Sequence, residues 1–261
     1  MHPELFSIGP LTLHTYGLLI AIGLVAGIMV ASWIGRSQRI EFQKIMDMGL
    51  ILIITGIIGS RLAYVIINFS YYKTYPLDIF KLWNGGLVFS GGLIAVLLVI
   101  VWYAKKSGYS LWQLGDLWAP AAAVGQAIGR IGCFMAGCCY GKPTDMPWGV
   151  VFTDPRSLVP QDMLNIPLHP TQLYSSLSGF IIFIILMILS VKKRFEGQVL
   201  LWFLILHSTS RLLIERFRGD DRGLIFGGAW TATQFLTVII LIVSIIMLFI
   251  LKSRKEKLKA K

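Results

Sequence analysis

The chain has 261 residues, of which 56% are hydrophobic and only 14% are charged. This apolar excess is typical of an integral membrane protein and excludes an ordinary soluble domain. The net charge of +11 does not indicate a nucleic-acid partner, because six of the basic residues lie in the tail Lys252–Lys261, directly after a hydrophobic run. Such a tail is typical of a cytoplasmic anchor against anionic membrane lipids.

The apolar segments of the sequence predict an all-α polytopic membrane protein with seven transmembrane helices. Its first residues, Met1–Leu13, lack the basic segment of a cleavable signal peptide, so we expect them in the mature protein. Most of the apolar segments that follow reach the roughly 20 residues needed to cross a bilayer, although the third and sixth are short. The seven segments are Tyr16–Ile34, Met48–Asn68, Leu87–Tyr103, Leu117–Phe134, Leu173–Val191, Val199–Leu213 and Trp230–Leu251.

The distribution of Lys and Arg predicts the orientation of these helices. The flanks that share a side with the C-terminus contain 14 Lys and Arg residues, and the opposite flanks contain 8. Because cytoplasmic flanks carry the excess of basic residues, we expect the N-terminus outside and the basic tail 252–261 in the cytoplasm. The loop 139–170 is then extracytoplasmic, and its prolines make it irregular but stiff. With the shorter loop Ser70–Gly86 it is expected to form a small head on a single membrane domain spanning 1–261.

An arginine lies deep in the fourth apolar segment, within the sequence Gly129-Arg130-Ile131-Gly132. An arginine at membrane depth costs about 2.5–3.5 kcal/mol on insertion scales and usually faces a cavity or a partner. Glycines beside it let a ligand or another backbone come close. This combination predicts a pocket that holds a negatively charged group.

Two further polar groups of residues lie at the ends of apolar segments. His207, Arg211 and Glu215 are spaced four apart, so they line one stripe of a helix. The segment His169–Tyr174 stands at the mouth of the fifth span. Structural readings stay open for both groups, since Arg211 with Glu215 could be an ordinary ion pair near a helix end and His169 could belong to a helix-start turn.

Two more residues admit both a functional and a structural reading. Tyr16 could be an interfacial tyrosine, and Arg61 could extend to the membrane surface or make a structural pair. Three cysteines, Cys133, Cys138 and Cys139, form neither a disulfide framework nor a recognised zinc spacing. We expect them to be small packed residues, with a thiol or metal role as the alternative, and we predict no metal and no cofactor.

Several motifs along nearly the whole chain resemble those of the prolipoprotein diacylglyceryl transferase family. The most specific are Gly-Arg-x-Gly at Gly129–Gly132 and His-Pro-x-Gln-x-Tyr at His169–Tyr174, in this order. The remaining matches are His14–Gly17, Gly59–Tyr64, Trp83–Gly86 with Gly91 and Gly92, Gly137 with Tyr140 and Gly141, and Arg211 with Glu215 and Arg218.

The resemblance implies an enzyme of the bacterial inner membrane. Members move the diacylglyceryl group of phosphatidylglycerol to the lipobox cysteine thiol in the signal peptide of a preprolipoprotein, which forms a thioether and releases glycerol phosphate. The resemblance places the phosphatidylglycerol-binding arginine at Arg130 and a second essential arginine at Arg211, with Tyr16 and Glu215 also at functional positions. We assign further substrate contacts to Arg61, Gly91, Gly92, Gly129, Gly132, Gly141, His169, Gln172 and Arg218.

The arginines at these positions suit the chemistry of this reaction. A phosphate leaving group needs fixed positive charge near its oxygens, and the planar guanidinium of arginine matches phosphate. Ser90 stands where many members have a histidine, so His207, Glu215 or water remain as proton acceptors. We favour a thiolate stabilised by the arginines alone.

Two other classes of function stay open at this point. The first is a transporter or channel for an anionic small molecule, which would also use buried arginines and helices interrupted by glycine. The second is an assembly protein of the cell envelope, in which the polar residues hold helices together.

Overall fold

The structure is a computed structural model that describes residues 3–8, 11–220, 223–225 and 230–259. It divides into two compact units, one made of Met1–Ala31 and Gly115–Lys261 and the other of Ser32–Leu114. Eight α-helices run along the described residues: α1 (Thr15–Ser37), α2 (Phe42–Ile67), α3 (Phe69–Thr74), α4 (Phe89–Ser107), α5 (Leu111–Ala136), α6 (Thr171–Lys192), α7 (Gln198–Glu215) and α8 (Ala232–Lys259).

Each of the seven predicted spans coincides with one long helix. Among the described residues, five helices are long and apolar enough to cross a membrane, namely α1, α2, α4, α6 and α8. The helix α5 is long enough but contains Pro120, Gln126 and Arg130, and α7 has only 18 residues, among them His207 and Arg211. The helical architecture fits the predicted all-α membrane protein, while the number of crossings and their direction stay predictions.

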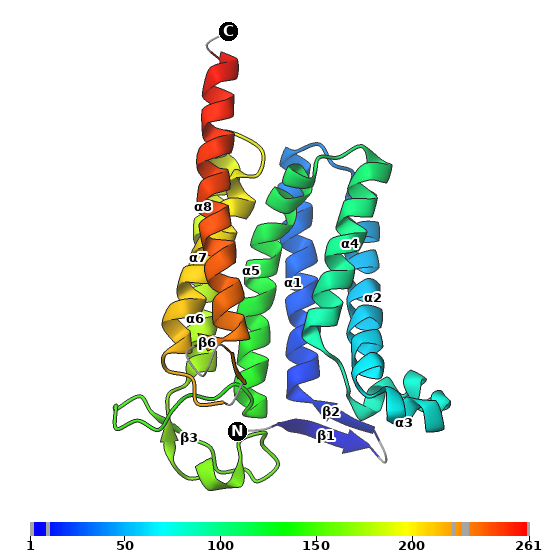
Figure 1. Cartoon of the computed structure of the whole chain (residues 1–261), viewed down its shortest axis with the longest axis vertical. Coiled ribbons are helices and arrows are strands. Elements are labelled where there is room, and N and C mark those ends of the chain that lie inside the picture. The colour runs from blue at the N-terminus through cyan, green and yellow to red at the C-terminus, as the bar shows by residue number, and fades with distance from the viewer. Residues whose placement is uncertain (1–2, 9–10, 221–222, 226–229, 260–261) are drawn as a thin grey trace. The chain divides into compact units, whose positions relative to one another are not determined.

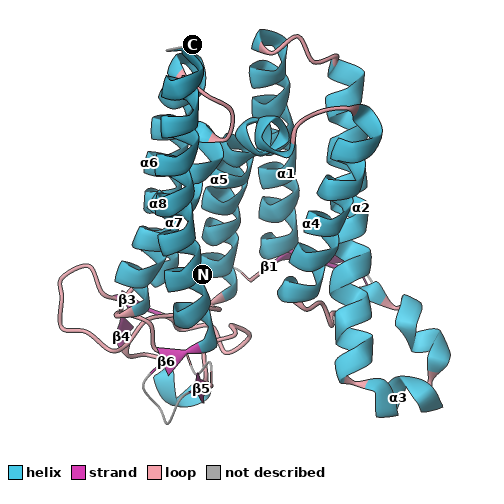
Figure 2. Ribbon diagram, turned by 45° about the horizontal axis from the view of Figure 1, so that its top comes forward, coloured by secondary structure: helices cyan, strands magenta, loops and turns pink. Residues whose placement is uncertain are grey.

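Among the described residues, three small antiparallel strand pairs accompany the helices and were not predicted. They pair β1 (Glu4–Ile8) with β2 (Leu11–His14), β3 (Val150–Val151) with β4 (Pro167–Leu168), and β5 (Leu224–Ile225) with β6 (Trp230–Thr231). Two of the three are only two residues long on each side, too short for a period-two pattern to be recognised. In Figure 2 the strands appear in magenta beside the cyan helices.

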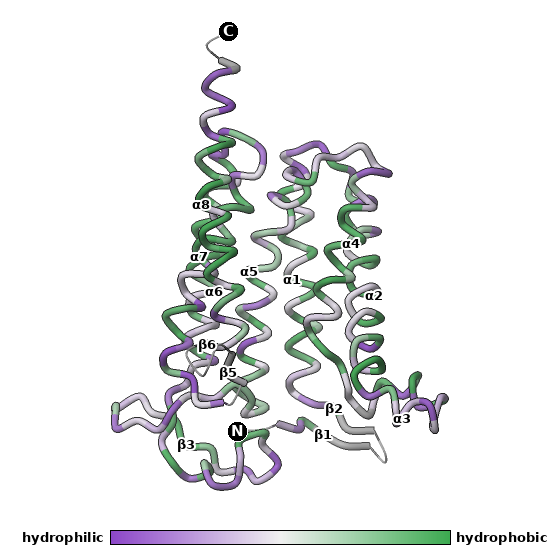
Figure 3. The backbone as a smooth tube through the Cα atoms, viewed as in Figure 1, coloured by the Kyte–Doolittle hydropathy of each residue, from purple (hydrophilic) through white to green (hydrophobic). Residues whose placement is uncertain are grey.

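Small residues bring the helices of the larger unit together. A Cβ atom on Gly23 of α1 would lie 3.0 Å from the carbonyl oxygen of Gly125 in α5, and one on Gly179 of α6 would lie 3.0 Å from the Ala127 side chain. Membrane helices commonly associate through such small residues because lipid provides no hydrophobic force between them. Figure 1 shows α6, α7 and α8 side by side, and Figure 3 shows that these helices are apolar along most of their length.

A buried carboxylate holds α5 against the turn between α6 and α7. Asp116 is 1% exposed and accepts hydrogen bonds from the backbone N–H groups of Gly197 at 2.9 Å and Leu200 at 3.0 Å. The Lys193 ammonium lies 3.6 Å from the same carboxylate. Next to this anchor, the apolar core joins Ala119, Ala123, Ile182, Leu186 and Val199 from α5, α6 and α7.

The segment 137–170 follows α5 and packs on itself. Phe152, Val159 and Leu168 are almost fully buried in it, and Phe152 meets Phe134 of α5 edge to face at 5.9 Å. The other predicted part of the head, Ser70–Gly86, belongs to the smaller unit and forms α3 and the 3-10 helices Pro76–Phe80 and Leu82–Asn84. A single membrane domain with a common head therefore stays a prediction, as does the basic tail, whose last two residues lie outside the described part of the chain.

In the smaller unit, glycines let α4 lie directly against α2. An added Cβ at Gly59 would meet the side chain of Ala95 and lie 2.8 Å from the carbonyl oxygen of Gly91. Gly91 and Gly92 are equally crowded by residues of α2. These close contacts show that Gly91 and Gly92 are packing residues. Their predicted contact with substrate stays a prediction.

Candidate active site

Arg130 and Arg211, far apart in sequence, line one cavity between α5, α6 and α7. We call it the arginine cavity, and its volume is about 30 Å³. His207 lies on its wall together with the polar residues Gln126, Ser175, Ser178 and Ser210. The stripe formed by His207 and Arg211 on α7 therefore faces Arg130 on α5. A cavity this small holds one or two water molecules, so a lipid headgroup can enter only if the surrounding side chains move.

The two arginines differ in their electrostatic partners. Arg211 Nη2 lies 2.8 Å from Glu215 Oε2, and their side chains are only 12% and 5% exposed. The spacing of four residues on α7 puts the two groups on one face, as the sequence predicted. By contrast, Arg130 forms no ion pair with any residue that the structure describes. The cavity therefore keeps a positive charge after Glu215 has balanced Arg211.

The glycines on either side of Arg130 bring α1 close to α5. A Cβ atom on Gly129 would lie 3.2 Å from Ile20, and one on Gly132 would lie 3.2 Å from the ring of Tyr16. Tyr16 is 43% exposed and belongs to the first turn of α1. Bulkier residues at these positions would push α1 away, so the glycines set the distance between Tyr16 and the helix that carries Arg130.

His207 has an aromatic neighbour as well as two cationic ones. Its ring stacks on Phe203, with centroids 5.6 Å apart and an angle of 27° between the planes. Phe203 lies one turn earlier on α7, which fixes the imidazole against the helix. The imidazole thus has a defined position on the wall of the arginine cavity, from which it can exchange a hydrogen bond or a proton with a bound group.

The segment His169–Tyr174 forms a clamp at the start of α6. The His169 Nδ1 atom lies 3.1 Å from the Tyr174 hydroxyl, which accepts a hydrogen bond from Trp148 Nε1 at 2.8 Å. The His169 ring also meets Phe217 edge to face at 5.1 Å. The buried amide of Gln172 donates to the carbonyl oxygen of Cys138 at 2.8 Å. These contacts tie the segment after α5 to α6 and to the end of α7.

Gly141 and Arg218 lie side by side next to this clamp. Gly141 bonds through its N–H to the carbonyl oxygen of His169, and an added Cβ would lie 2.8 Å from the carbonyl oxygen of Phe217. The Arg218 guanidinium is 3% exposed and donates to both carboxylate oxygens of Asp220, at 2.8 and 2.7 Å. Both residues are therefore held by neighbouring protein groups, and a contact with substrate stays a prediction.

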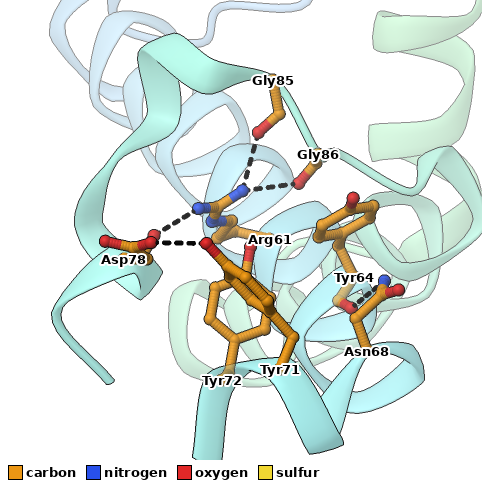
Figure 4. Close-up of a pocket in the computed structure, with 8 residues that line it drawn as sticks. All are labelled: Arg61, Tyr64, Asn68, Tyr71, Tyr72, Asp78, Gly85 and Gly86. Carbon is orange, nitrogen blue, oxygen red and sulfur yellow. Dashed lines mark hydrogen bonds between the residues drawn. The ribbon is translucent and has the colours of Figure 1, made fainter. Parts of the chain in front are cut away.

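Arg61 lies in the smaller unit, where it organises the segment 78–86 (Figure 4). Its guanidinium donates to five backbone carbonyl oxygens, those of Asp78, Ile79, Lys81, Gly85 and Gly86, at 2.6 to 3.3 Å. It is 6% exposed and forms part of the wall of a cavity of about 340 Å³ with Tyr64, Tyr72 and Asn68. These hydrogen bonds agree with a structural role for Arg61, one of the two interpretations that its sequence position allowed. Its contact with substrate stays a prediction.

Sequence reasoning missed several polar residues in the larger unit. Asp116 was overlooked although an acid directly before an apolar run is a signal of an anchored carboxylate. Gln126 is one helical turn before Arg130, and Ser210 is three residues after His207, so periodicity alone could have placed both near the cavity. The hydrogen bond between Ser178 and Ser210, by contrast, joins α6 to α7 and depends on tertiary packing.

Comparisons with known proteins give one consistent result. The family model described as prolipoprotein diacylglyceryl transferase matches residues 3–250. A phosphatidylglycerol–prolipoprotein diacylglyceryl transferase of Clostridium tetani is 34% identical over 256 residues, which cover 98% of this chain and 100% of that protein. Proteins with the same name from Geobacter sulfurreducens and Oleidesulfovibrio alaskensis are 33% and 35% identical, over 97% of this chain and 96% and 95% of their own lengths.

Proposed function

Because the chain belongs to the prolipoprotein diacylglyceryl transferase family, we propose that it transfers diacylglyceryl from phosphatidylglycerol to the lipobox cysteine of preprolipoproteins. The observation that best supports this proposal is that Arg130 and Arg211 line the same cavity. The reaction is the first step of lipoprotein lipidation. It needs a site that binds a phosphodiester and then stabilises a phosphate monoester as it leaves.

The transfer forms one bond and breaks one. The thiolate sulfur of the substrate attacks the glyceryl carbon that carries the phosphate, and a C–S bond forms as the C–O bond breaks. Glycerol phosphate leaves with the electron pair, so negative charge grows on its oxygens. Arg130 and Arg211 stabilise that charge, since preorganised donors in a site with little water act strongly on a developing anion.

The other polar residues of the cavity have supporting roles in this proposal. Glu215 orients the Arg211 guanidinium through the 2.8 Å ion pair. His207 contacts the bound phosphate, while the positive charge of the cavity lowers the thiol pKa of the substrate. Tyr16, Gly129 and Gly132 shape the approach beside Arg130. Contacts by Arg61, Gly91, Gly92, Gly141, His169, Gln172 and Arg218 with the lipid or the peptide belong to the same proposal.

The proposed location is the inner membrane of a bacterium. Seven helices cross the bilayer, with the N-terminus outside, the loop 139–170 outside and the basic tail in the cytoplasm. The five strongly apolar helices support a protein with several crossings. For α5 and α7, the half-buried side chains of Arg130, His207 and Arg211 line the cavity between helices, which would let these less apolar segments cross, because polar groups in a bilayer face the protein interior.

Transfer to a labelled lipobox peptide tests the activity directly. The purified protein is mixed with vesicles of phosphatidylglycerol, and the products are analysed by mass spectrometry. We expect a thioether-linked diacylglyceryl peptide and an equal amount of glycerol phosphate. A peptide with serine in place of the lipobox cysteine serves as the control. If folded protein makes no lipidated peptide but carries glycerol phosphate across the vesicle membrane, the transporter alternative replaces this proposal.

A further inference from the structure

Three thiols that the transfer reaction does not use gather at the end of α5. Cys133 lies in the last turns of α5, and Cys138 and Cys139 lie in the turn that follows. Their Sγ atoms all lie within 4.8 Å of one another, and all three cysteines are free. The spacing C-x4-C-C did not predict this cluster, because the side chains of two adjacent residues usually point in different directions.

An unusual backbone turn brings the two adjacent cysteines back toward Cys133. Gly137 has a φ of 79° and Cys139 a φ of 62°, and the left-handed region is uncommon for a residue other than glycine. Two fully buried side chains hold the turn. Thr171 Oγ1 donates to the carbonyl oxygen of Cys139 at 2.7 Å, and Gln172 Nε2 donates to that of Cys138 at 2.8 Å. The cluster is therefore a firmly held arrangement.

Guanidinium groups beside the cluster favour thiolate. The buried guanidinium of Arg218, whose side chain is 3% exposed, lies beside the Cys139 sulfur. Arg130 lies one helical turn before Cys133 and adds a second positive charge on that side. Thiolates are the form of cysteine that binds metal ions, so the environment prepares at least one of the three sulfurs as a ligand.

We propose that Cys133, Cys138 and Cys139 bind one thiophilic d10 metal ion, Zn²⁺ or Cu⁺. Bound at about 2.3 Å from each sulfur, such an ion holds its ligand atoms roughly 3.8–4.0 Å apart, so rotations of the side chains that close the gaps by less than about 1 Å complete the site. Soft thiolate ligands select these ions over Mg²⁺, Ca²⁺ or Mn²⁺.

The number of protein ligands limits the coordination of the ion. Within the described part of the chain, no histidine or carboxylate joins the three sulfurs as a fourth ligand. Three thiolates complete a trigonal Cu⁺ site, whereas Zn²⁺ takes its fourth ligand from water. Binding forms three metal–sulfur bonds and releases the remaining thiol protons to solvent. The site goes beyond the proposed transfer of diacylglyceryl, which uses the thiol of the substrate.

Metal content tests the proposal. The full chain, purified in detergent with an affinity tag that lacks histidine, is reduced, loaded anaerobically with Zn²⁺ or with Cu⁺, and desalted. We expect one ion per chain in at least one arm, and the arm that retains it identifies the metal. The triple variant Cys133→Ser, Cys138→Ser, Cys139→Ser is expected to retain none. The matched control Ser157→Ala, which removes a single buried hydroxyl near Gly137, is expected to retain it.

Thiol labelling of the unmodified protein keeps the test independent of any variant's folding. In the loaded protein we expect a maleimide reagent to spare the three cysteines until a chelator is added, after which all three react. The proposal is overturned if both metals leave the desalted protein while all three thiols react at once. It is also overturned if the triple serine variant retains as much metal as the parent, because the ion then binds elsewhere. Neither result depends on whether the protein transfers diacylglyceryl.

Discussion

At the scale of single residues, two cations around one cavity carry the proposed function, and they have different neighbours. Glu215 balances Arg211, and the part of the chain that the structure describes offers Arg130 no acid. An anion in the cavity therefore meets an uncompensated charge at Arg130. A guanidinium also offers two parallel donors, so its shape contributes as much as its charge.

This difference predicts that lysine cannot replace Arg130. We expect Arg130→Lys and Arg130→Ala each to lower kcat for diacylglyceryl transfer by about 10²–10³-fold, the usual effect of removing one donor from a developing anion. The measurement is turnover with phosphatidylglycerol vesicles at saturating peptide. Arg156→Lys is the matched control, since Arg156 is 58% exposed and pairs with Asp154 at 2.8 Å. Near-normal turnover of Arg130→Ala would refute the phosphate assignment.

A second prediction concerns the proton of the substrate thiol. If the arginines stabilise the thiolate without a dedicated base, His207→Phe lowers turnover by only a few-fold and leaves the shape of the pH–rate profile unchanged. The measurement is kcat/KM as a function of pH for the variant and the parent. A loss of about 100-fold together with the disappearance of a pKa near neutrality is the result that a general base at His207 predicts instead.

At the scale of elements, close helix contacts depend on residues without side chains. The contact between α2 and α4 in the smaller unit is made by Gly59, Gly91 and Gly92. The N-terminus of α5 is held by a buried carboxylate, Asp116, which satisfies two backbone N–H groups at the start of α7. Both devices fix helix positions without a large apolar core, as expected where the outer surfaces face lipid.

Two glycine-to-alanine changes separate packing from helix propensity. Alanine favours a helix over glycine by about 1 kcal/mol, so both Gly17→Ala and Gly59→Ala gain the same intrinsic term. A Cβ at Gly17 meets nothing within 4 Å, whereas one at Gly59 lies 2.8 Å from the carbonyl oxygen of Gly91. We expect Gly59→Ala to destabilise the protein by about 1–3 kcal/mol through overpacking and Gly17→Ala to be neutral or stabilising. Thermal unfolding in detergent measures both, and equal effects would contradict the packing assignment.

At the scale of the whole molecule, the direction in which the chain crosses the membrane decides which side receives the substrate. In the larger unit, the strand pairs and the segment 137–170 all join the helices at one end, where α1, α6 and α8 begin and α5 and α7 end. The excess of Lys and Arg predicts that the opposite ends face the cytoplasm. Secreted precursors would then reach the end that carries His169 and Gly141.

Reporter fusions measure this orientation. A reporter that is active only outside the cytoplasm, fused after Lys261, is expected to be silent, because the basic tail remains in the cytoplasm. The same reporter inserted after Asp145, in the predicted outer loop, is expected to be active. A protein with an active C-terminal fusion would have a different number or direction of crossings.

The sequence by itself determined the helices, the family and the shared helix face of the polar residues on α7. Long apolar runs need backbone hydrogen bonds satisfied within each segment, so hydropathy alone predicts helices closely. All seven predicted spans coincide with helices, and among the described residues five of these are long and apolar enough to cross a membrane. The helical period placed His207, Arg211 and Glu215 on one face of a helix. The ion pair between Arg211 and Glu215 confirms that these two side chains share that face. The motifs identified the family, because they combine chemistry with fixed order along the chain.

Only the tertiary structure decided which distant residues meet. Hydropathy and helical period say nothing of the rotation of one helix against another, so they could not place Arg130 beside His207 and Arg211. The five carbonyl contacts of Arg61 arise because a separate segment folds over it. The left-handed turn at Cys139 likewise gathers three thiols whose spacing matches no known pattern. Contacts of this kind depend on backbone direction and close approach, which a linear pattern of residues does not contain.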